Sequence, residues 1–175
     1  MTEALQTRSA VHRDMCRLTG ALARWSRGLE APLSQTDIEL LGLVLGYVEQ
    51  YLERTRQSDR RAHFYRAVRL RAAGAAGLVD QIERDRAARP ALLRQLRAEL
   101  GGLETADGLG FAAFCTTLET YAKRLQEDVA RREEALFPIA REALLESDWS
   151  QICAAIRHDG GAGAGTVARA QSSAP

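Results

Sequence analysis

The sequence predicts an all-α protein, an up-down-up-down four-helix bundle with a short C-terminal helix. Apolar residues recur at alternating spacings of three and four, each gap between the four long runs contains glycine or proline, and no segment alternates like a strand. Long helices joined by short loops pack most simply as antiparallel neighbours around one core. We therefore expect one domain over residues 8–156. Residues 157–175 have few large apolar groups and are expected to form a disordered tail.

Composition limits the environment and the partners of the chain. The 175 residues carry a net charge of +1, so no global field draws the protein to nucleic acid or to an anionic membrane. No apolar run has the length of a signal peptide or of a membrane span, which makes a cytoplasmic location the expectation. Cys16, Cys115 and Cys153 are odd in number and widely spaced, so they are expected to be buried free thiols.

The first helix is expected over about Ser9 to Leu29, and the second begins near Thr36. In the second, Thr36 and Glu39 form a predicted capping box. The helical pattern then continues less regularly through Val68, with a loosening near residues 57–59. The two apolar stripes are Val11, Met15, Leu18, Leu22, Trp25 and Leu29, then Ile38, Leu41, Leu45, Val48 and Leu52.

The third helix follows a turn at Gly74 and Gly77, and its stripe includes two charged residues. Pro90 lacks an amide hydrogen, so this helix is expected to kink or restart there. The stripe consists of Val79, Ile82, Arg86, Arg89, Leu93, Leu96 and Leu100.

The fourth helix begins near Phe111 and is expected to bend at Pro138, after which Ser147 caps a short last helix with Trp149, Ile152 and Ile156. Its stripe is Phe111, Phe114, Leu118, Tyr121, Leu125, Asp128, Arg132, Ala135 and Ile139. Two charged residues thus occupy apolar positions. Burial of a charge is costly unless the charge is paired or binds an ion.

The predicted topology brings the irregular positions of all four helices to one end of the bundle. These positions are Met15, Arg56, Arg60, Arg86, Asp128 and Arg132. A layer of inward residues from four helices is where bundles build metal sites.

At these positions the chain resembles the hemerythrin-like HHE cation-binding domains, over about residues 8–156. The most similar stretch is REEALFPIAREALLESDW at 132–149, and HRDM at 12–15 is similar to the family's opening motif, with Met15 at a ligand histidine. Arg56 to Arg60 resemble its "HHPKE" segment, and Arg86 stands at the histidine of the third helix. Asp128 and Arg132 fall on its "HxxxE" motif.

The resemblance implies a di-iron scaffold whose ligands have been replaced. Guanidinium has no lone pair to donate to a metal, so only Asp128 among these positions can still coordinate one. We expect a layer without metal or other cofactor, in which Asp128 pairs with Arg86, Arg60 or Arg132. The chain is expected to be a non-enzymatic structural, sensing or binding module, because no nucleophile with an adjacent base and no phosphate loop is visible.

Two alternatives stay open. The excess of arginine in the layer could hold a small anion, such as phosphate, sulfate or a carboxylate. A working non-haem di-iron protein, handling oxygen or nitric oxide or supplying iron for repair of iron centres, would need ligands from unexpected positions. These are His12, Cys16, His63, Asp128 and Glu133.

The remaining polar residues receive less specific interpretations. His12 is expected at a surface or boundary, His63 at the edge of the core, and His158 in solvent. A protein partner and self-association remain open, whereas a nucleic-acid role has little support because no aromatic platform accompanies the arginines.

Overall fold

The structure is a computed structural model that describes residues 2–56, 60–103 and 108–155. Within these ranges, the side chains of 2–9, 11, 52–56, 60–62 and 108 also lie outside the description. The described chain is helical and contains no strand, which confirms the predicted all-α class. Its elements are α1 (Thr2–Ser26), α2 (Gln35–Arg56), α3 (Arg60–Arg71), η1 (Ala73–Ala75), α4 (Ala76–Gly101), α5 (Gly108–Ala130), η2 (Arg131–Leu136), α6 (Phe137–Ala143) and a helix over residues 146–155.

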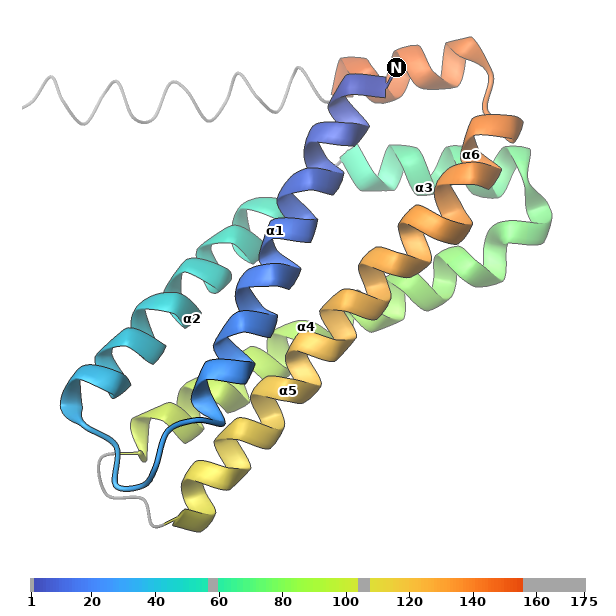
Figure 1. Ribbon diagram of the computed structural model, residues 1–175. Helices are drawn as coiled ribbons and strands as arrows, with labels where there is room; N and C mark the ends of the chain where they lie inside the picture. Colours follow the sequence, from blue (N-terminus) through green and yellow to red (C-terminus); the bar gives the residue numbers. More distant parts are fainter. Residues whose placement is uncertain (1, 57–59, 104–107, 156–175) are drawn as a thin grey trace, which may run out of the picture.

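The long helices lie alongside one another, and the short ones gather at one end (Figure 1). α5 packs against α1 and α4, while α2 packs against α4 and, more lightly, α1. The connection between α1 and α2 lies at the same end of the molecule as the start of α5. α3 packs against η1, α4 and α6 at the opposite end.

The first two helices differ from the prediction at their boundaries. α1 begins at Thr2, seven residues before the expected start, because residues 2–8 contain good helix formers and no glycine or proline. α2 is capped by Ser34 and Asp37, and the predicted pair of Thr36 and Glu39 was wrong. The Asp37 amide donates to Ser34 Oγ over 3.2 Å, and the Ser34 amide donates to Asp37 Oδ2 over 3.3 Å.

The predicted continuation of the second helix through Val68 was also wrong. α2 ends at Arg56, and α3 leaves along a different direction (Figure 1). The expected loosening at 57–59 lies outside the described residues. Pro90, by contrast, neither ends nor restarts α4, which is one helix from Ala76 to Gly101.

The last helical run contains a wide π-helical turn, which changes the face turned inward. Within η2 the Phe137 amide donates to the Arg132 carbonyl, a bond over five residues. This turn adds one residue, so Leu136 and Ala140 are fully buried whereas the predicted Ala135 and Ile139 are half-buried. Pro138 follows directly. It has no amide hydrogen to donate, which explains why the regular helix is interrupted just before it.

The final helix starts without the predicted cap. Ser147 is exposed, and Asp148 Oδ2 accepts the Leu145 amide over 2.9 Å instead. Ile156, His158 and the predicted tail lie outside the described residues. Among the helices that are described, none combines the length and the apolar character needed to cross a lipid bilayer.

The buried apolar residues form two separate clusters. The first core joins α1, α2, the later half of α4, and α5. Its members include Met15, Leu41, Leu45, Val48, Leu93, Leu96, Phe114, Leu118, Tyr121, Leu125 and Val129. The second core joins α3, η1, the early part of α4, η2, α6 and the helix over residues 146–155. Its members are Phe64, Tyr65, Val68, Ala75, Val79, Ile82, Leu136, Ala140, Leu144, Trp149 and Ile152.

Candidate functional site

A charged layer occupies the space between the two cores. Along α4, Ile82 belongs to the second core and Leu93 to the first, and the charged residues lie between them. Along α5 and η2, the same is true between Val129 and Leu136. We call this set the charged layer: Asp85, Arg86, Arg89, Asp128, Arg131 and Arg132. Three of the six predicted irregular positions, Arg86, Asp128 and Arg132, belong to this layer, and the second core lies beyond them.

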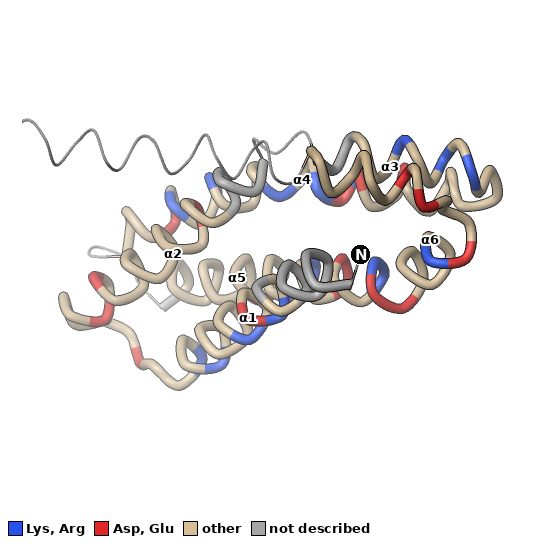
Figure 2. The backbone as a smooth tube through the Cα atoms, turned by 90° about the horizontal axis from the view of Figure 1, so that it is seen from above, with Lys and Arg blue, Asp and Glu red and all other residues tan. Residues whose placement is uncertain are grey.

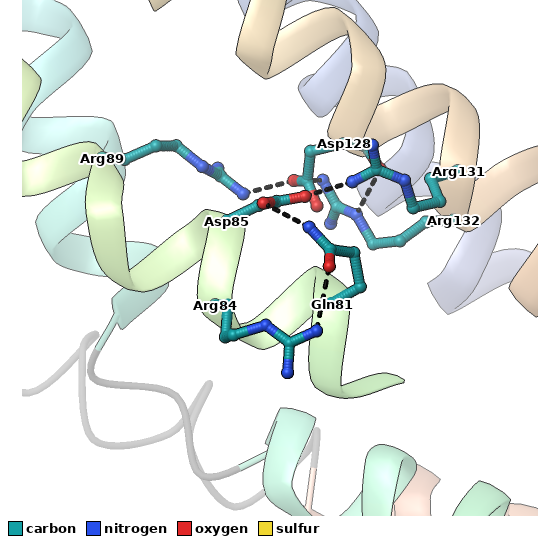
Figure 3. A network of polar contacts seen from close by, with 7 residues as sticks. All are labelled: Gln81, Arg84, Asp85, Arg89, Asp128, Arg131 and Arg132. Atoms are coloured by element: carbon teal, nitrogen blue, oxygen red, sulfur yellow. Dashed lines mark hydrogen bonds and ion pairs between the residues drawn. The ribbon is translucent and has the colours of Figure 1, made fainter. Parts of the chain in front are cut away.

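Asp128 is the centre of the layer. Its side chain is 1% exposed, and Oδ2 accepts hydrogen bonds from two guanidinium groups (Figure 3). Arg132, one turn further along, donates from Nη2 over 2.7 Å and from Nε to the Asp128 carbonyl over 3.2 Å. Arg89 donates from α4, with its own side chain 6% exposed. This buried triad joins α4 to the end of α5 by charge-assisted hydrogen bonds.

A second, more exposed ion pair lies at the rim of the layer. Arg131 pairs with Asp85, and both side chains are about one-third exposed. Gln81 Nε2 donates to Asp85 over 2.8 Å, and Arg84 donates to Gln81 Oε1 over 2.9 Å (Figure 3). Because this pair is hydrated, it contributes less to stability than the Asp128 triad.

Arg86 is half-buried and lies within electrostatic reach of the triad. Burial lowers the pKa of its guanidinium; Tyr65 opposes this, Arg89 and Arg132 lower it further, and Asp128 raises it. The group nevertheless stays protonated near neutral pH. Of the arginines predicted to pair with Asp128, Arg132 makes the contact, and Arg89, which was not among them, makes another.

The other predicted positions fall in different surroundings. Met15 is buried in the first core. Arg56 ends α2 and Arg60 begins α3, but the side chains of both lie outside the described residues. The structure therefore brings together Asp128 and Arg132 from the predicted set, with Arg86 nearby.

The residues considered as alternative metal ligands lie in different surroundings, and of these Cys16 is within electrostatic reach of Asp128 and Glu133. His12 is buried and packs edge-on against Tyr51, with ring centroids 5.6 Å apart, so its surface placement was wrong. His63 is exposed rather than at the core edge. Glu133 lies 3.6 Å from Arg13. No group of three or more histidine, cysteine, aspartate or glutamate side chains suited to a metal ion occurs among the described residues.

Cys16 is a buried thiol beside the layer. Burial raises its pKa to about 11; Arg132 opposes the shift, and Asp128 adds to it. The thiol is therefore protonated at neutral pH and is a poor nucleophile.

Several buried side-chain oxygens have no hydrogen-bond partner among the described residues, including Asp128 Oδ1, Glu133 Oε1, Glu99 Oε2 and the Tyr121 hydroxyl. Burial raises the pKa of Tyr121 above its usual range, against the opposing effect of Arg89. This hydroxyl is therefore a neutral donor inside the first core.

Charge elsewhere is distributed over the helices rather than gathered on one face (Figure 2). Two arginines of α3 are paired within the fold: Arg69 contacts Asp80 and Glu83, and Arg71 contacts Asp148. The charged layer is therefore distinguished by its burial and not by the number of its charges.

The layer residues that sequence reasoning did not select are Asp85, Arg131 and Arg89, of which Arg89 contacts Asp128. Arg89 lies in the predicted stripe of the third helix, one turn after Arg86, and the burial implied by that stripe was the available signal. Its contact with Asp128 depends on how α4 and α5 are aligned, which periodicity within one helix does not specify.

Comparison of the chain with protein-family models, curated proteins and solved structures finds no significant match.

Proposed function

We propose that this chain is a non-enzymatic structural, sensing or binding module on an up-down-up-down four-helix bundle of the hemerythrin-like type. In this proposal the charged layer takes the place of a di-iron centre. The observation that carries it is the buried Asp128 carboxylate held by Arg89 and Arg132. Two guanidinium groups there supply positive charge to the carboxylate without offering a lone pair to a metal.

The chemistry of the neighbouring groups supports the same proposal. Cys16 stays protonated beside the layer, and Met15 is buried in the first core. His63 is exposed and His12 packs against Tyr51, which gives no support to the di-iron alternative, because that alternative would need several ligands to converge on Asp128.

Metal analysis of the purified protein tests this proposal. Protein produced with added iron should contain far less than one iron per chain and show no absorption band of a bridged iron pair. Two variants prepared in the same way serve as controls: Asp128→Ala, which removes the one ligand-position side chain able to coordinate, and Asp14→Ala at an exposed ion pair. Stoichiometric iron that is lost in Asp128→Ala but kept in Asp14→Ala would establish the di-iron alternative.

A small anion is the ligand class that the layer favours within this proposal. Arg86, Arg89 and Arg132 bring three guanidinium groups to the region of one buried carboxylate. Guanidinium binds phosphate, sulfate and carboxylates through paired hydrogen bonds. Calorimetric titration with phosphate and with sulfate should give heat and raise the melting temperature. If titration gives no heat and no change in melting temperature, the layer has a structural role and does not bind these anions.

A further inference from the structure

Three features of the described chain lie at the same level of the molecule. The two cores share no residue. Where they meet, the charged layer provides ion pairs in place of apolar packing. Two helical runs pass from one core to the other: α4, and the run from α5 through η2 to α6. In each of them the regular helical hydrogen bonding is interrupted at the charged layer.

In α4 the irregularity is Pro90, which directly follows Arg89. Proline cannot donate a hydrogen bond to the carbonyl four residues earlier, so the Arg86 carbonyl lacks that helical bond. In the other run it is the π-helical turn of η2, which begins at Arg131. Irregular turns of this kind weaken the regular hydrogen-bond ladder of a helix.

The short helices have their contacts on one side of the layer. α3 packs against η1, α4 and α6, and the described side chains that cover Phe64 and Val68 belong to the second core. The described buried apolar side chains of α1 and α2 belong to the first core. Proteins open in cooperative units of this kind, whose boundaries follow gaps in apolar packing.

We infer that the second core is a separate cooperative unit, which opens while the first core stays folded, and that the charged layer is the boundary between them. Opening hydrates Asp128, Arg89 and Arg132 and makes them accessible to solutes. The inference depends on packing and not on the proposed function, so the metal analysis and the test below can fail independently.

Hydrogen exchange of the full chain under native conditions tests the inference with two matched variants. Val48 in α2 and Val68 in α3 are both fully buried, one in each core. Val68→Ala should accelerate exchange of the second-core amides, over residues 64–82 and 136–152, on the order of tenfold. Acceleration in this variant shows that exchange of the second-core amides measures opening of the second core.

Val48→Ala is the decisive variant. It should accelerate first-core amides, over residues 41–48, 93–100 and 114–125, by a similar factor and leave the second-core amides unchanged. This is because the first core remains folded when the second opens. If Val48→Ala accelerates both sets equally, or if both sets are equally protected in the unmodified protein, the chain unfolds as one unit and the inference is wrong.

Discussion

The two cores bury apolar surface in different ways. The first is mainly aliphatic and is built where long helices meet along their lengths. The second is smaller and richer in aromatic residues: the Phe64 ring lies 6.0 Å from that of Phe137 and 6.3 Å from that of Trp149. The first core thus follows from the periodicity of individual helices. The second depends on contacts between short segments distant in the sequence, and the charged layer lies between the two.

Loss of the Asp128 carboxylate should have the largest effect on the stability of the protein. Asp128→Ala leaves Arg89 and Arg132 buried without their shared acceptor, which should destabilise the protein by about 3–5 kcal/mol. The measurement is urea unfolding. The control is Asp14→Ala, whose pair with Arg17 is largely exposed and should cost at most about 1 kcal/mol. Equal losses of unfolding free energy in the two variants would mean that the Asp128 triad stabilises the protein no more than an exposed ion pair does.

The π-helical turn gives the next largest prediction. Leu136 is fully buried in the second core, whereas Ile139 is half-buried at its edge. Leu136→Ala should therefore cost about 2–5 kcal/mol, and Ile139→Ala clearly less, in urea unfolding. An uninterrupted α-helix would place Ile139 inward. A larger loss for Ile139→Ala would thus contradict the wide turn.

The ion pair between Arg71 and Asp148 makes the second core sensitive to acid. The hydrogen bonds from Arg71 and from the Leu145 amide lower the pKa of Asp148 below its usual value. A carboxyl with a lowered folded-state pKa stabilises the fold above its unfolded pKa, and this contribution disappears as the pH falls through the folded value.

The comparison of Asp148→Asn with the unmodified protein measures this contribution. The variant should melt at a lower temperature near neutral pH, and the difference should shrink as the pH falls below the ordinary aspartate pKa of about 3.9 and through the lowered pKa of the folded state, where the carboxyl of the unmodified protein becomes protonated. A difference that stays constant with pH would show that the charge of Asp148 does not stabilise the fold.

The glycines of α2 predict the smallest effects. A Cβ at Gly46 would lie 3.1 Å from Arg97 Nη2, whereas one at Gly42 would lie 3.7 Å from a Leu100 methyl group. Alanine favours a helix over glycine by up to about 1 kcal/mol. Gly42→Ala should therefore stabilise the protein more than Gly46→Ala, where Arg97 must move from its pair with Glu49. Thermal melts of both variants measure the difference, and the reverse order would contradict this packing.

The sequence was sufficient to predict the helical class and most of the first core. The stripe from Phe111 to Asp128 is buried throughout, because in a regular helix residues three and four apart share one face. The prediction failed beyond Asp128, where one extra residue in η2 moved Leu136 inward in place of Ala135. A π-helical turn has no local sequence pattern that reveals it.

The sequence predicted that the candidate site contains buried charged residues, but it identified only some of those residues. The two charged interruptions of the α5 stripe indicated a buried pair, and Arg132 contacts Asp128. The role of Arg89 required the alignment of α4 with α5, and the second core required the change of direction between α2 and α3. Both are tertiary features that the periodicity of a single helix leaves undetermined.

The most direct test of the charged layer is a double-mutant cycle on Asp128 and Arg89, followed by urea unfolding. Arg89→Leu, introduced into the Asp128→Ala variant, should cost little or restore stability, because it removes a guanidinium that has lost its partner. Arg86→Leu in the same background is the control, because Arg86 is a half-buried neighbour of the triad that was also predicted to pair with Asp128. If the losses from Asp128→Ala and Arg89→Leu simply add, the two side chains do not interact, and the account of the layer is wrong.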